Sequence, residues 1–117
     1  MFDFENLTVY KTAESFNNAI FNFLKSSPVD NFLKDQLKRA STSIVLNIAE
    51  DAGRFLKKDK RNFYIMARGS VFERAAILKI LKSNNEIIDN SYSDLYDETE
   101  SLSKMLMGLI KNLSVPS

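Results

Sequence analysis

The chain has 117 residues, 44% of them hydrophobic, and this length and composition suit one globular domain with a sizeable core. Only 3 Gly and 2 Pro are present, too few for an all-β fold built on tight turns, and 16 basic against 15 acidic residues exclude strong binding of polyanions through net charge alone. The absence of Cys and His excludes a disulfide framework, a thiol nucleophile and the usual imidazole general base.

The first predicted helix covers residues 8–25. Asn6 or Thr8 is the expected N-cap, and Pro28 follows its end, because proline disfavours helical geometry in the residue before it. Its apolar side chains recur at steps of three and four, the spacing of one helix face: Val9, Ala13, Phe16, Ile20 and Phe23.

The second predicted helix, residues 31–52, has two different faces side by side. Asp30 or Asn31 suits its start, and Gly53 suits a left-handed residue at its end. An apolar stripe at helical spacing consists of Leu37, Ala40, Ile44, Ile48 and Ala52. A polar ladder borders this stripe and consists of Gln36, Arg39, Ser43, Asn47, Glu50 and Arg54. Surface helices usually place their polar residues opposite the core, so the polar ladder is a candidate functional surface.

The third predicted helix, residues 60–82, follows a short basic link, residues 53–59, with Asp59 as its N-cap. Gly69 lies in its middle, where glycine costs about 1 kcal/mol relative to alanine. A close approach by a neighbouring helix would justify that cost. The apolar residues of this helix are Phe63, Tyr64, Ala67, Val71, Ala75, Leu78 and Leu81.

The fourth predicted helix, residues 91–113, has the heptad pattern typical of bundle packing, and Pro116 follows its end. Its heptad residues are Tyr92, Leu95, Thr99, Leu102, Leu106, Leu109 and Leu113. Residues 83–117 carry 2 basic and 6 acidic residues, a net −4, whereas residues 1–82 carry 14 basic and 9 acidic residues, a net +5. The acids gather around the start of the helix, where its dipole favours them.

Four helices joined by short links predict an all-α fold, an antiparallel up-down-up-down four-helix bundle that forms one domain over residues 1–117. The alternative is an open pair of helical hairpins that completes its core only in an oligomer. No apolar run of 18 residues exists, so neither a transmembrane helix nor a membrane partner is expected. The N-terminus carries acids before its first lysine and lacks a signal-peptide pattern, so we expect a cytoplasmic protein.

Several motifs in the second and third helices are characteristic of a known family. The strongest is Ser43-Ile44, followed by Asn47-Ile48-Ala49-Glu50 and by Gly53-Arg54. Further matches are Gln36-Leu37-Lys38-Arg39-Ala40, then Phe63, Ala67-Arg68-Gly69-Ser70 and Glu73, and the opening Leu7-Thr8-Val9-Tyr10-Lys11 with Ala13. Together they resemble the bacterial four-helix-bundle family that includes the proteins encoded within intervening sequences of 23S rRNA genes. Asp51 departs from the pattern, because the family usually has glycine there.

This resemblance implies a four-helix bundle that assembles into a ring, a homo-pentamer, with no known enzymatic activity. A relative of the family is the accessory protein of diversity-generating retroelements, which works with a reverse transcriptase and RNA. The relation makes binding of RNA or DNA a hypothesis for this chain. The accessory protein is more basic.

A set of polar residues on the second and third helices is the first candidate site. The members are Ser43, Asn47, Glu50, Arg68 and Glu73. One interpretation is a small polar pocket that binds a ligand or RNA; the other, which we favour, is a structural polar network that sets helix register or a subunit contact. Arg68 and Glu73 lie five residues apart, so at most one of them is expected to face the polar ladder.

The basic link is the second candidate site. It gathers five positive charges around the single acid Asp59: Arg54, Lys57, Lys58, Lys60 and Arg61. One interpretation is a nucleic-acid contact with the nearby rings of Phe55, Phe63 and Tyr64 available for stacking. The other is a solvated turn whose charge keeps the bundle soluble.

Metal and cofactor sites are not expected. Di-iron bundles take Glu from two helices and Glu-x-x-His from each of the other two, but this chain has no His and its first helix has only Glu14. We therefore expect a non-enzymatic homo-oligomeric scaffold or interaction protein, with no cofactor and no small-molecule substrate. The alternative is an RNA- or DNA-binding accessory that acts as a ring through the basic link.

Overall fold

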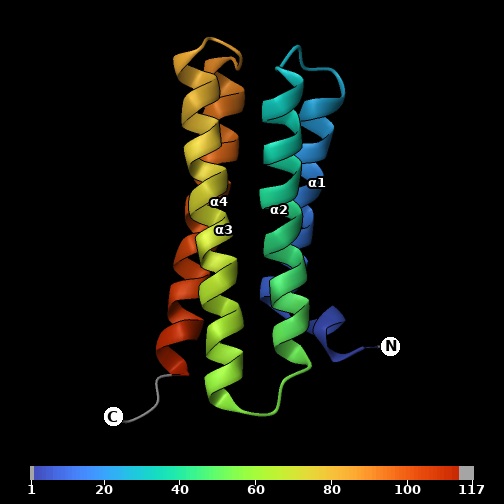
Figure 1. Ribbon diagram of the computed structural model, residues 1–117, viewed down its shortest axis with the longest axis vertical. Helices are drawn as coiled ribbons and strands as arrows, with labels where there is room; N and C mark the ends of the chain where they lie inside the picture. Colours follow the sequence, from blue (N-terminus) through green and yellow to red (C-terminus); the bar gives the residue numbers. More distant parts are fainter. Residues whose placement is uncertain (1, 114–117) are drawn as a thin grey trace.

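The computed structural model describes residues 2–113, and four long helices dominate it (Figure 1). The elements are a short 3-10 helix η1 (Asp3–Asn6) and the α-helices α1 (Thr8–Lys25), α2 (Asn31–Ala52), α3 (Lys57–Ser83) and α4 (Asp89–Asn112). Each α-helix packs against its neighbours in sequence, and α4 also packs against α1, so the bundle closes within one chain. The predicted all-α, up-down fold is confirmed, while Pro116 lies outside the described residues.

The link between α2 and α3 lies at one end of the long axis, and the other two connections lie at the opposite end (Figure 1). The molecule measures 45 Å along this axis. Because α4 starts at the end opposite the α2–α3 link, its acidic first turns lie far from the basic link.

Two helix starts differ from the prediction. Lys57 begins α3 about one turn earlier than residue 60, with Leu56 in an extended conformation before it. Asp59 is therefore not an N-cap but a first-turn acid, where the helix dipole still favours it. Similarly, α4 begins at Asp89 rather than at residue 91.

The predicted cap at the start of α2 is right, the one at its end is partly wrong, and the one expected for the first helix is wrong, because Leu7 rather than Asn6 or Thr8 is the N-cap residue of α1 and provides no side-chain cap. Asp30 caps α2, because its Oδ2 accepts hydrogen bonds from the backbone N–H of Phe32 at 3.0 Å and of Leu33 at 3.3 Å. Gly53 ends α2 but has φ −85° and ψ 0°, not the predicted left-handed conformation. The left-handed position is instead Asn85, with φ 58°, in the turn after α3, where asparagine tolerates it better than most residues.

Two apolar clusters fill the bundle, one at each end. The cluster towards the α2–α3 link contains Val9, Ala13, Ile44, Ile48, Tyr64, Ala67, Val71, Leu102, Leu106 and Ile110. The cluster at the opposite end contains Ile20, Leu24, Val29, Leu37, Ala40, Ile77, Leu78, Leu81, Ile87, Tyr92 and Leu95. Their positions along each helix leave a polar layer between them, which we define as Ser41, Arg74 and Thr99, all at most 1% exposed.

Arg74 is the centre of this polar layer. Its Nε donates a hydrogen bond to Thr99 Oγ1 at 2.8 Å, and Thr99 Oγ1 donates to the Leu95 carbonyl at 2.7 Å. Burial lowers the pKa of Arg74 to about 10, although the negative charge of Glu98 acts in the opposite direction. The guanidinium is therefore held in the core by the hydrogen bond to Thr99 and by electrostatic attraction to Glu98, and within residues 2–113 its Nη2 makes no hydrogen bond.

Candidate functional site

An open groove runs along α2 on the side that faces α3. Its larger part has a volume of about 740 Å³ and is lined by Lys38, Arg39, Thr42, Ser43, Leu46, Asn47, Glu50, Arg54 and Phe63. An adjoining hollow of about 250 Å³ is lined by Gln36, Arg39, Ala40, Ser43 and Glu73. Because Arg39 and Ser43 line both parts, we describe them together as the ladder groove. All six residues of the polar ladder line the ladder groove. The polar ladder therefore faces an open surface and is not a closed, buried network.

A hydrogen bond joins the two walls of the ladder groove. The Ser70 hydroxyl of α3 donates to Ser43 Oγ of α2 at 2.9 Å. Asn47 stays within its own helix, because its Nδ2 donates to the Ser43 carbonyl at 2.9 Å and to Ser43 Oγ at 3.1 Å. Glu50 and Arg54 form an ion pair at 2.8 Å, and the Arg54 guanidinium also lies 4.6 Å from the centre of the Phe63 ring.

The predicted polar network divides between two surfaces. Ser43, Asn47, Glu50 and Glu73 line the ladder groove. Arg68 lies elsewhere on α3: it lines a hollow against α4, and its guanidinium lies 4.5 Å from the centre of the Phe72 ring. Two side chains five residues apart on an α-helix point in different directions, which explains why Arg68 and Glu73 face different surfaces.

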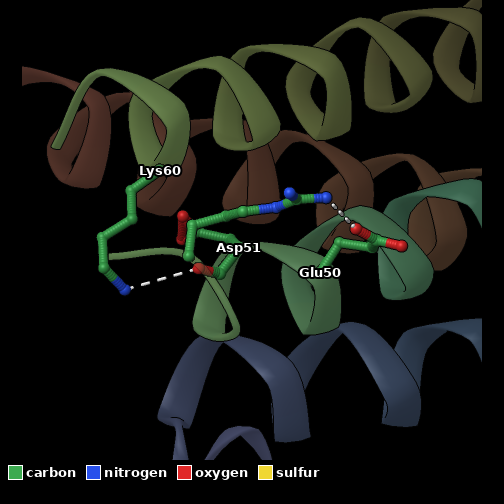
Figure 2. A network of polar contacts seen from close by, with 4 residues as sticks. Glu50, Asp51 and Lys60 are labelled. Carbon is green, nitrogen blue, oxygen red and sulfur yellow. Dashed lines mark hydrogen bonds and ion pairs between the residues drawn. The ribbon is translucent and has the colours of Figure 1, made fainter. Parts of the chain in front are cut away.

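The five predicted nucleic-acid residues also face different surroundings. Arg54 lines the ladder groove, while Arg61 lines the hollow between α3 and α4 together with Arg68 and Lys111. Lys60 Nζ donates to the backbone carbonyl of Asp51 at 3.3 Å (Figure 2). Lys57 and Lys58 are exposed on the first turn of α3.

Asp51 is a buried carboxylate, 1% exposed, at the end of α2. Burial raises its pKa, and this effect is partly opposed by a hydrogen bond from the Tyr64 side chain and by the charge of Lys60. The same burial and the neighbouring carboxylate raise the pKa of Tyr64. Asp51 thus connects the end of α2 to the beginning of α3, at the position where the resemblance leads one to expect glycine.

Some groove residues escaped the sequence analysis. Lys38, Thr42 and Leu46 step by four residues beside the polar ladder, and this spacing was the signal that could have included them. Arg74 also fits the apolar pattern of its helix, three residues after Val71 and four before Leu78. A charged residue at such a position predicts a buried polar contact.

Within residues 2–113, no group of three or more Asp, Glu, His or Cys side chains could hold a metal ion. The described helices also include none that is long and apolar enough to span a bilayer.

The surfaces described above fall within a match to a known protein family. The model of the 23S rRNA-intervening sequence protein family matches residues 5–108, which include the ladder groove, the link and most of α4. The chain belongs to this family. The resemblance noted from its motifs is therefore confirmed.

A crystal structure from Bacteroides thetaiotaomicron has the same fold as this member of the intervening-sequence family. It is described as a protein with unknown function from the S23 ribosomal protein family. The two chains are 24% identical, the match covers 89% of this chain and 99% of the other, and the TM-score is 0.84. At this identity the likeness shows the fold alone. A comparison with curated proteins gives no match.

Proposed function

We propose that this protein is a homo-oligomeric interaction or scaffold protein that carries out no catalysis. The supporting observation is an apolar stripe on the outer face of α3, away from the bundle core. It consists of Ile65, Met66, Gly69, Phe72, Ala76 and Ile80, all exposed. Phe72 is 55% exposed and Met66 54%, and a run of large apolar side chains on one helix face is typical of an interaction site.

Gly69 lies in the middle of this α3 stripe. A Cβ built on Gly69 would meet no atom within 4 Å, so packing inside the chain does not require glycine there. Glycine nevertheless costs the helix about 1 kcal/mol relative to alanine. A helix of another copy that approaches closely at Gly69 would account for both observations, because glycine lets two helix backbones come near each other.

The finer points of the proposal rest on the family resemblance and the composition. The proposed assembly is a ring of five copies in the cytoplasm that needs no cofactor and no small-molecule substrate. The lack of His and Cys supports the proposed absence of catalysis, because these residues supply the most frequent general bases and nucleophiles.

Light scattering coupled to size exclusion tests the proposal directly. At micromolar concentration, the measured mass should be about five times the chain mass of 13.4 kDa. A mass that stays at one chain would contradict self-assembly. A mass of another small multiple would retain the scaffold and exclude the pentamer.

Binding of RNA or DNA is the second candidate function. It is supported by the exposed Lys57 and Lys58 and by the cations along the ladder groove, which Arg54 connects to the link. Few phosphates can be neutralised by one subunit of net charge +1, so binding should require the assembly and fall steeply with salt.

The test of this second candidate is the double change Lys57→Gln and Lys58→Gln, measured with single-stranded and structured RNA and with DNA at low salt. Lys60 is left unchanged because its Nζ donates a hydrogen bond to the Asp51 carbonyl. Replacing Lys60 would remove this bond, and a loss of affinity could then result from a less stable fold rather than from a lost RNA contact. A clear loss of affinity with unchanged oligomer mass would support the candidate. Absence of binding by the unchanged protein would contradict it.

A further inference from the structure

The α2–α3 link carries two large apolar side chains that are left largely uncovered by the described residues, 2–113. Phe55 is 99% exposed and Leu56 is 65% exposed. They stand next to each other at one end of the long axis, between Arg54 and the exposed Lys57 and Lys58 (Figure 1). We call residues 54–58 the tip.

Charge is distributed unevenly between the two ends of the molecule. Beside the tip, Glu50 is paired with Arg54 and Asp51 is buried, so the acid that most directly offsets the exposed lysines is the half-buried Asp59 in the first turn of α3. The short helix η1 lies to the side of the same end (Figure 1), and its acids Asp3 and Glu5 are exposed. The opposite end carries the acidic start of α4. An anionic surface would therefore attract the tip more strongly than the far end, where Lys25 and Lys82 offset part of the acidic charge.

We propose that the tip inserts into the interface of an anionic lipid bilayer, so that the protein binds membranes peripherally. Phe55 and Leu56 would enter the boundary between headgroups and acyl chains, and Lys57 and Lys58 would contact the anionic headgroups. This revises the expectation of no membrane partner, which rested on the lack of a spanning segment. It does not depend on the proposed self-assembly.

A lipid surface fits the tip better than a nucleic acid does. The tip is a projecting turn with two large exposed apolar side chains, whereas the open ladder groove beside it is lined mostly by polar and charged side chains. Leu56 has no aromatic face on which a base could stack, but aliphatic and aromatic side chains both gain from leaving water for the lipid interface. Cations beside exposed apolar residues are the usual composition of segments that bind anionic membranes.

Co-sedimentation of the full-length protein with lipid vesicles tests the inference. The probes are vesicles of equal parts phosphatidylglycerol and phosphatidylcholine, and vesicles of phosphatidylcholine alone. The unchanged protein should sediment with the first and not with the second. The double variant Phe55→Ser and Leu56→Ser should lose about ten-fold or more in apparent affinity, because both inserted side chains are gone.

Phe32→Ser is the matched control. Phe32 is 67% exposed, but it lies at the start of α2, at the opposite end, next to Asp30. This variant removes an exposed ring without touching the tip, so its vesicle binding should equal that of the unchanged protein. Equal binding by the tip variant and the unchanged protein would overturn the inference, as would an absence of binding by the unchanged protein.

Fluorescence gives a second measurement, because the chain contains no Trp. In Phe55→Trp, the indole emission should shift to the blue with phosphatidylglycerol vesicles, and in Phe32→Trp it should stay unchanged. Light scattering of the tip variant decides between this inference and a subunit contact: a changed oligomer mass would overturn membrane insertion. Loss of RNA affinity in the tip variant, without any vesicle binding by the unchanged protein, would assign the tip to nucleic acid instead.

Discussion

Two ionisable side chains occupy apolar positions of their helices and are nearly inaccessible to water. Asp51 follows Ile48 by three residues, and Arg74 follows Val71 by three, and each is 1% exposed. Helical spacing in the sequence locates both positions. It does not identify their partners, which are Tyr64 for Asp51 and Thr99 for Arg74. These partners depend on how the helices are aligned against each other. Such alignment is a property of the packed bundle.

Removing the charge of Asp51 should stabilise the fold at neutral pH. Burial raises the folded-state pKa of Asp51 above its ordinary value of 3.8, so the folded protein binds this proton more tightly than the unfolded chain does. The resulting destabilisation is absent below pH 3.8 and develops as the pH rises through the folded-state pKa. Asp51→Asn should therefore raise the free energy of unfolding at pH 7 and leave it nearly unchanged at pH 3.

Urea unfolding at the two pH values measures this effect. A loss of stability at pH 7 would contradict the account, and would mean that attraction to Lys60 and the Tyr64 hydrogen bond outweigh the burial of the charge.

Arg74 is predicted to matter chiefly through the space it fills and the contacts it makes. Arg74→Ala should lower the free energy of unfolding by about 3 kcal/mol, because it leaves a cavity and removes a buried partner of Thr99 and Glu98. Arg74→Met restores most of the volume without the charge and should cost much less. Thermal or chemical denaturation of both variants provides the comparison, with the exposed Lys79→Ala as the control. Equal losses in the Ala and Met variants would show that the charge, not the volume, stabilises the bundle.

At the scale of the helices, periodic spacing predicted all four helices because each buries one continuous stripe. The start of α3 was less predictable, since Leu56 is extended and no side chain caps the helix. The ladder groove was only half predictable. The polar ladder can be recognised from the sequence of α2 alone. Whether it lines an open groove depends on which residues of α3 pack beside it.

The two central residues of the polar ladder should differ in their importance. Ser43→Ala removes the hydrogen bond from Ser70 that joins α2 to α3, and should cost about 1 kcal/mol. Among the residues that the structure describes, Asn47 bonds only to Ser43 in its own helix, and alanine is the better helix former, so Asn47→Ala should change stability by less than about 0.5 kcal/mol. Melting of the two variants side by side checks this order. A large loss for Asn47→Ala would mean that Asn47 contacts another copy in the assembly.

At the scale of the whole molecule, three surfaces remain after the core is packed: the ladder groove, the apolar stripe of α3 and the tip. The ladder groove lies between α2 and α3, and the tip lies at one end of the long axis, so the proposed contact through the outer face of α3 leaves the tip available for another partner. From the sequence, self-assembly is also expected because of apolar residues outside the main stripes of the first and fourth helices, Phe21, Met105, Met107 and Ile110. In the structure Ile110 is buried and the other three are half-buried. A run of large exposed apolar side chains lies on α3 instead, because exposure depends on which face each neighbouring helix covers.

The central claim is that the outer face of α3 joins copies of the chain, and one pair of glycine variants tests it most directly. Within residues 2–113, a Cβ at Gly69 or at Gly108 would meet no atom within 4 Å outside the adjoining turns of its own helix, so Gly69→Arg and Gly108→Arg should both leave the subunit folded. Gly69 lies among exposed apolar residues, whereas Gly108 lies beside the exposed Lys104 and Lys111. Light scattering should give the Gly69→Arg protein a mass near 13.4 kDa, and give Gly108→Arg the mass of the unchanged assembly. An undiminished mass for Gly69→Arg would contradict the claim.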